Sequence, residues 1–74
     1  MSKYPAITGR RLIKALGKME FQIVRTKGSH CFLQHSDGRC TVIPVHAGET
    51  IGRGLLARIM RDCEISLEDL NKLL

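Results

Sequence analysis

Two very short connections between apolar segments constrain the fold of this chain more than any other feature. Segments rich in Phe, Ile, Val and Thr favour β-strands at residues 21–27, 30–35 and 39–45. Only Gly28 and Ser29 separate the first two segments, and Ser36, Asp37 and Gly38 separate the second from the third. Parallel strands need a crossover of about a dozen residues or more, so these connections predict a three-stranded antiparallel sheet.

Apolar residues recur at helical spacing in the segments that precede and follow the three predicted strands in the sequence. Thr8 is positioned to cap a helix that continues to about Lys18, because its hydroxyl can accept hydrogen bonds from the first turn. Thr50 is the expected cap of a second helix, and Ser66, with Asp69 three residues later, gives a capping-box signal for a short third helix. The apolar faces contain Leu12, Ile13, Leu16 and Met19 in the first helix and Leu55, Leu56, Ile59, Met60 and Cys63 in the second.

This order of elements predicts an α+β sandwich, with the helices on one face of the sheet and the other face open. At 74 residues we expect a single domain over residues 1–74. The sequence has no apolar run of the roughly 20 residues that span a bilayer, and its first eight residues lack the apolar core of a signal peptide. Three cysteines without a C-x-x-C pair fit reduced thiols (Cys31, Cys40, Cys63). We therefore expect a cytoplasmic protein with no membrane partner.

Basic residues are concentrated near the start of the sequence. Residues 1–27 carry a formal charge of +6, residues 28–50 carry −1 and residues 51–74 carry none. The first segment contains seven basic residues against Glu20, namely Lys3, Arg10, Arg11, Lys14, Lys18, Arg25 and Lys27. Four of them gather opposite the apolar stripe of the first predicted helix, namely Arg10, Arg11, Lys14 and Lys18. A one-sided positive charge suggests a polyanionic partner such as RNA, and a solvated charged face is the alternative.

The predicted turn between the first two strands contains a group of residues suited to phosphodiester chemistry. Gly28 allows a ligand to approach the backbone closely, and Ser29 offers a hydroxyl and an amide. His30 follows at the head of a predicted strand, and a histidine side chain ordinarily titrates near neutral pH. With Lys27 beside them, these residues could hold and attack a phosphodiester. A common turn followed by a solvated histidine is the alternative interpretation.

Over nearly its whole length the chain resembles the HicA toxins, the small messenger-RNA endonucleases of bacterial and archaeal toxin–antitoxin pairs. The resemblance rests on the basic first helix, on residues 27–30 before a strand, on the sequence TVIPVH at 41–46 and on the Leu-rich helix at 54–60. It implies a fold like that of double-stranded-RNA-binding domains, with His30 as the catalytic histidine and Gly28 and Ser29 as part of its signature.

The resemblance also implies a HicB-type antitoxin that covers His30 and the basic face. Members of the family often have a second histidine directly after the first, where this chain has Cys31. Two other functions remain open at this stage, a non-catalytic RNA-binding module and a small interaction domain. The segregated positive charge argues against the interaction domain.

RNA provides its own nucleophile, because a 2′-hydroxyl can attack the adjacent phosphate once a base removes its proton. We expect His30 to be that base, with a 2′,3′-cyclic phosphate and a 5′-hydroxyl as the products. Lys27, Arg25 or backbone amides could stabilise the charge on the phosphate oxygens, and Ser29 could donate to one of them. His46, after Pro44, is a second candidate for the site, with a structural role as its alternative. The general acid is not assigned.

We expect no metal and no cofactor in this site. The possible ligands Cys31, His35, Cys40 and His46 lack the short paired spacing of common zinc sites. A two-metal nuclease needs clustered carboxylates, whereas the strand region, residues 21–50, contains only two, Asp37 and Glu49. His35 is expected at the far end of its strand from His30, in contact with solvent.

Overall fold

The computed structural model describes residues 4–74, so Lys3, which the charge count includes, lies outside the described residues. Its elements, in chain order, are α1 (Gly9–Gly17), β1 (Gln22–Lys27), β2 (His30–Gln34), β3 (Cys40–Pro44), α2 (Arg53–Cys63) and α3 (Leu67–Leu73). The strands are ordered β1-β2-β3 and both pairs are antiparallel. The predicted α+β architecture is therefore confirmed, and each strand begins and ends within one residue of the predicted segment.

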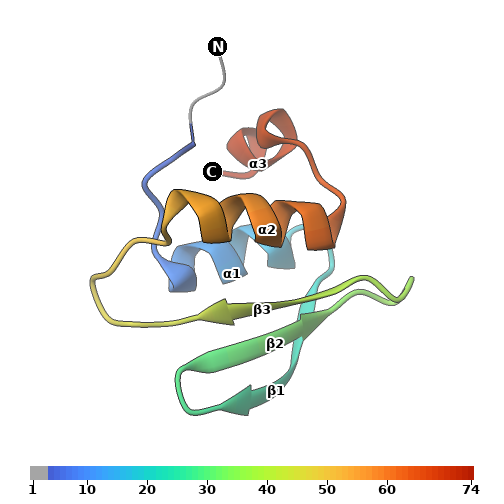
Figure 1. Cartoon of the computed structure of the whole chain (residues 1–74). Helices are drawn as coiled ribbons and strands as arrows, with labels where there is room; N and C mark the ends of the chain where they lie inside the picture. The colour runs from blue at the N-terminus through green and yellow to red at the C-terminus, as the bar shows by residue number, and fades with distance from the viewer. Residues whose placement is uncertain (1–3) are drawn as a thin grey trace.

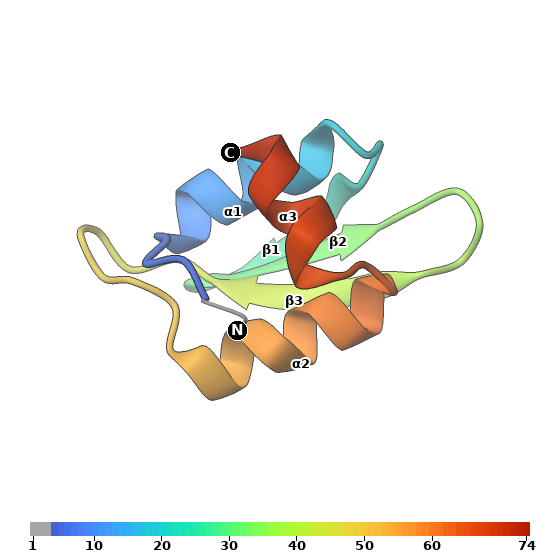
Figure 2. The same cartoon turned by 90° about the horizontal axis from the view of Figure 1, so that it is seen from above.

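The three helices form a layer over one face of the sheet, and the opposite face is open (Figure 1). Seen from above, α1 and α2 lie over the sheet with α3 crossing between them (Figure 2). The core is formed mainly by aliphatic side chains with almost no exposure, namely Ile7, Leu12, Leu16, Leu33, Ile43, Leu56, Ile59 and Leu70. Among residues 4–74, no helix is long and apolar enough to cross a membrane.

Helix α1 begins as its sequence predicts and packs unusually close to the sheet. The Thr8 hydroxyl accepts a hydrogen bond from the backbone N–H of Arg11 at 3.2 Å. Gly9, the first helical residue, is buried, and a Cβ atom at this position would overlap the carbonyl oxygen of Pro44. Glycine therefore lets the first turn of α1 contact the backbone at the end of β3.

The prediction that Thr50 caps the second helix is wrong. The N-cap of α2 is Gly52, without a side-chain hydrogen bond, and Thr50 instead forms an isolated antiparallel bridge with Thr8. Next to this bridge the backbone N–H of Ile51 donates to the carbonyl of Ile7 at 2.7 Å. Pairing with the segment before α1 thus holds Thr50 in an extended conformation, short of the helix start.

The capping signal for the third helix is confirmed. The Ser66 hydroxyl accepts from the backbone N–H of Asp69 at 3.0 Å, and the Asp69 carboxylate accepts from the backbone N–H of Ser66. This capping box fixes the start of α3. Leu70 is then fully buried, and it attaches the short helix to the core.

Strand β1 is an exposed edge strand with one irregularity. All six of its residues are exposed, including Ile23 and Val24. Ile23 pairs with Leu33 and Arg25 pairs with Phe32, so Val24 is an extra residue in the ladder. Such a β-bulge places two residues opposite one residue of the neighbouring strand, here Val24 and Arg25 opposite Phe32.

Cys63 is expected to be unreactive in the folded protein. It is fully buried on α2, and burial, with a smaller contribution from the Asp62 charge, raises the pKa of its thiol from 9.0 to about 11. Only thiolates are alkylated efficiently. At pH 8 we therefore expect iodoacetamide to label the exposed Cys40 readily and Cys63 only after unfolding in guanidinium chloride, as read by peptide mass spectrometry. Equal labelling of both thiols in the native protein would contradict this packing.

The same difference in the pKa of Cys63 makes the stability of the fold depend on pH in the alkaline range. The unfolded thiol ionises near 9.0, whereas the folded thiol holds its proton until about pH 11. The unfolded state therefore loses its proton first, and the free energy of unfolding should fall as pH rises through this interval. Cys63→Ala, compared with the wild type over the same pH range, should show a smaller fall.

Candidate functional site

The turn between β1 and β2 sets the position of His30. Gly28 has a φ of 59°, whereas Ser29 does not have a positive φ, the pattern of a type II′ turn in a two-residue hairpin. Lys27 and His30 are consequently paired across the two strands. His30 is exposed, and side chains alternate along β2, where Leu33 faces the core. His30 therefore lies on the open face of the sheet.

Two other segments meet this turn at the same end of the sheet. The backbone N–H of Val45 donates to the carbonyl of Ser29 at 2.7 Å, and Pro44 is paired with His30 in the sheet. The exposed His46 follows directly and closes a turn in which its carbonyl accepts from the backbone N–H of Glu49 at 3.0 Å. The first turn of α1 also lies here, against Pro44 (Figure 1). His30 and His46 thus share one end of the molecule.

The basic residues predicted to bind RNA are divided between two layers. Lys27 belongs to the sheet, beside His30, and Arg10 lies at the start of α1, at the same end of the molecule. Arg11 and Lys14 continue along α1 in the helical layer, and Lys18 caps the C-terminus of that helix. There they line a shallow hollow with the C-terminal leucines, and Lys18 Nζ donates to the carbonyl of Leu73 at 2.8 Å. The structure therefore brings Arg10 and Lys27 toward the His30 end and leaves the rest of the α1 stripe apart from it.

His35 lies at the far end of β2 from His30, and the expectation that it is solvated is wrong. Its side chain is 18% exposed, its Nδ1 accepts from the backbone N–H of Asp37 at 3.1 Å, and its ring packs edge-on against Phe21 with centroids 5.2 Å apart. The backbone N–H of Arg39 holds the pKa of Asp37 below its ordinary value, and the Arg39 guanidinium adds to the effect. His35 therefore belongs to the structure of the β2–β3 hairpin.

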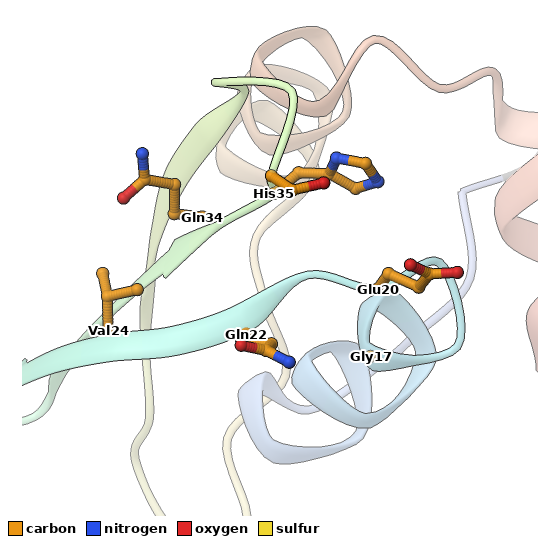
Figure 3. A pocket seen from close by; sticks show the side chains of 7 residues that line it. Gly17, Glu20, Gln22, Val24, Gln34 and His35 are labelled. Carbon is orange, nitrogen blue, oxygen red and sulfur yellow. The ribbon is translucent and has the colours of Figure 1, made fainter.

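Figure 3 shows a hollow at this same far end, with His35 on one wall and, on another, Gly17 at the end of α1 and Glu20 of the α1–β1 connection. Val24 and Gln34 of the neighbouring strands complete much of its lining. His30 does not contribute to it. The hollow is therefore a separate feature from the His30 end of the sheet.

Phe32, which the sequence did not single out as a site residue, lies two residues after His30 on the same face of β2. The Arg25 guanidinium stacks on its ring, with Cζ 5.3 Å from the ring centroid. Strand alternation alone places Phe32 beside His30. The contact with Arg25 depends on the bulge at Val24, which has no clear sequence signal.

The possible metal ligands of the strand region are not gathered in one place. Cys31 packs against the core, whereas Cys40 is exposed at the start of β3. Within residues 4–74, no three His, Cys, Asp or Glu side chains lie close enough together to hold a metal ion. The four residues Cys31, His35, Cys40 and His46 therefore do not form a ligand set in this fold.

Replacing Gly28 tests how strictly the turn positions His30. Nothing lies within 4 Å of a Cβ atom built at Gly28, so backbone conformation alone decides the cost. Alanine is disfavoured at a φ of 59°, and we expect Gly28→Ala to lower the free energy of unfolding by about 1–2 kcal/mol. Gly28→Asn should cost less, because asparagine tolerates positive φ. Thermal unfolding compares the variants, and equal losses for Ala and Asn would show that φ is not the cause.

Comparison with known proteins assigns most of this chain to one family. The family model of the HicA toxin of bacterial toxin–antitoxin systems matches residues 9–65, from the start of α1 to just beyond α2. The match includes the turn, His30 and His46. No curated protein matches the chain.

Proposed function

The chain belongs to the HicA toxin family of bacterial toxin–antitoxin systems, and we propose that it is a toxin that cuts messenger RNA with His30 as its general base. One observation carries the proposal. The matched region holds an exposed histidine on the open sheet face, at a tight turn and directly opposite Lys27. A polymeric substrate can reach a side chain in this position, whereas it could not reach a histidine in the core.

In the proposed reaction His30 removes the proton of a ribose 2′-hydroxyl. The 2′-oxygen then attacks the adjacent phosphorus, the bond from phosphorus to the 5′-oxygen breaks, and a 2′,3′-cyclic phosphate forms. The departing 5′-oxygen takes a proton and becomes a 5′-hydroxyl. His46 is our candidate for the group that donates this proton. The hydrogen bond from the Val45 N–H to the Ser29 carbonyl holds the segment that contains His46 at the same end of the sheet as His30. Lys27 supplies positive charge for the phosphate oxygens, and the backbone N–H groups of Gly28 and Ser29 are candidate hydrogen-bond donors to them.

The toxin family implies an antitoxin partner, and we propose a HicB-type protein that covers His30 and the neighbouring basic residues. The basic residues of α1 contribute to RNA binding through their charge, namely Arg10, Arg11, Lys14 and Lys18. We place the protein in the cytoplasm, where messenger RNA is found. Its three free cysteines are consistent with that reducing compartment.

The test is cleavage of a defined messenger RNA by the purified protein in excess EDTA. A matched RNA in which every 2′-hydroxyl is replaced by hydrogen should stay intact, because it lacks the nucleophile. His30→Ala, prepared in parallel, detects contaminating nucleases. Cleavage of the RNA by the wild type alone, with cyclic phosphate ends, supports the proposal. Binding without cleavage by either protein would instead assign the chain as a non-catalytic RNA-binding module.

A further inference from the structure

The open face of the sheet has a hollow beside Phe32, about 450 Å³ in volume. It begins two residues along β2 from His30, a separation of roughly 7 Å between Cα atoms. Residues of all three strands and of α2 line it, among them Val24, Arg25, Phe32, Cys40, Val42 and Arg58. A volume of this size is typical of small-ligand sites.

Phe32 has no part in the hydrophobic core. The core cluster and the partly buried side chains that pack against it include neither Phe32 nor its partner Val42. Phe32 is instead only partly buried and carries the Arg25 guanidinium on its ring. Packing therefore does not explain an aromatic ring at this position.

The charge around the hollow suits a nucleic acid. None of the three strands contains an acidic residue. Arg25 stacks on the Phe32 ring, and Arg58 of α2 also lines the hollow. Asp62 also lines the hollow, but its Oδ2 accepts a hydrogen bond from the buried Thr41 hydroxyl at 3.0 Å. The accessible charged groups beside Phe32 are thus predominantly cationic.

We propose that this hollow holds one base of the RNA substrate, next to the scissile phosphate at His30. The inference rests on the proposed function and specifies its substrate. Aromatic rings and guanidinium planes are the surfaces on which proteins stack unpaired bases, and Arg58 can pair with the flanking phosphate. The Phe32 ring has no hydrogen-bonding group, so stacking on it does not by itself distinguish one base from another. Bases of a duplex are already stacked, so the substrate is single-stranded.

The first experiment measures affinity for a single-stranded RNA in the His30→Ala protein, which does not cut it. Adding Phe32→Leu keeps an apolar side chain but removes the ring. We expect the Kd to rise roughly 5- to 100-fold, the range seen for loss of one stacked base. Ile23→Thr is the matched control, because it removes a half-exposed aliphatic side chain from β1 without altering the lining of the hollow. Circular dichroism verifies that all variants are folded.

The second experiment uses the exposed Cys40 as a probe of the hollow. Saturating single-stranded RNA should slow its alkylation several-fold, and a duplex of the same sequence should protect it less. Unchanged alkylation of Cys40, together with wild-type affinity of Phe32→Leu, would overturn the inference while wild-type RNA cleavage leaves the proposed function standing. If the wild type neither binds nor cuts any RNA, both are refuted.

Discussion

Replacing His30 with alanine is expected to lower the rate of RNA cleavage by about 10²–10⁴-fold, the usual contribution of a positioned general base. The loss should occur without unfolding, because His30 is exposed and joins the sheet through its backbone. Exposed substitutions of this kind typically change the free energy of unfolding by less than about 0.5 kcal/mol. Single-turnover cleavage with saturating protein measures the chemical step, and a thermal unfolding curve verifies the fold.

A second variant separates proton transfer from binding. His30→Gln keeps a polar side chain that forms hydrogen bonds but cannot remove a proton near neutral pH. We expect it to be as inactive as His30→Ala and to bind RNA with nearly wild-type affinity. A cleavage rate for His30→Gln close to that of the wild type would show that His30 is not the general base.

The parts of the fold that were predictable are those set by neighbours in sequence. The Thr8 cap and the Ser66–Asp69 capping box each involve residues three positions apart, and both occur as expected. Gly28 and Gly38 likewise have the positive φ values that short turns require. Thr50 carries the same local signal as Thr8, yet a strand-like pairing with a residue 42 positions earlier overrides it. Contacts between residues so far apart in the chain cannot be predicted from the local sequence.

The same distinction applies to the candidate site. Strand alternation places His30 and Leu33 on opposite faces of β2, as their spacing in the sequence implies, and the structure shows that Leu33 is the buried one. A count of charges along the chain could not show that Lys27 lies in the sheet whereas Lys14 and Lys18 lie in the helical layer. The solvation of His35 was wrongly predicted because its ring packs against Phe21, a residue distant in the sequence.

Gly9→Ala is expected to destabilise the protein strongly, although the same change usually stabilises a helix. Alanine normally stabilises a helix relative to glycine by up to about 1 kcal/mol. Here the added Cβ would overlap the Pro44 carbonyl, and the neighbouring atoms are also backbone, so no side chain can move aside. We expect a loss of about 3 kcal/mol, the upper range for overpacking, and a fall in Tm of roughly 10–20 °C.

Gly17→Ala is the matched control for this prediction, because it makes the same change at the other end of the same helix. Nothing lies within 4 Å of a Cβ atom at Gly17, so the ordinary preference for alanine should hold and the Tm should be unchanged or slightly higher. Thermal unfolding of both variants tests the opposite signs, and similar Tm values would show that α1 does not need its close contact with β3. Since Pro44 is paired with His30, Gly9→Ala should also slow RNA cleavage at temperatures at which the variant remains folded.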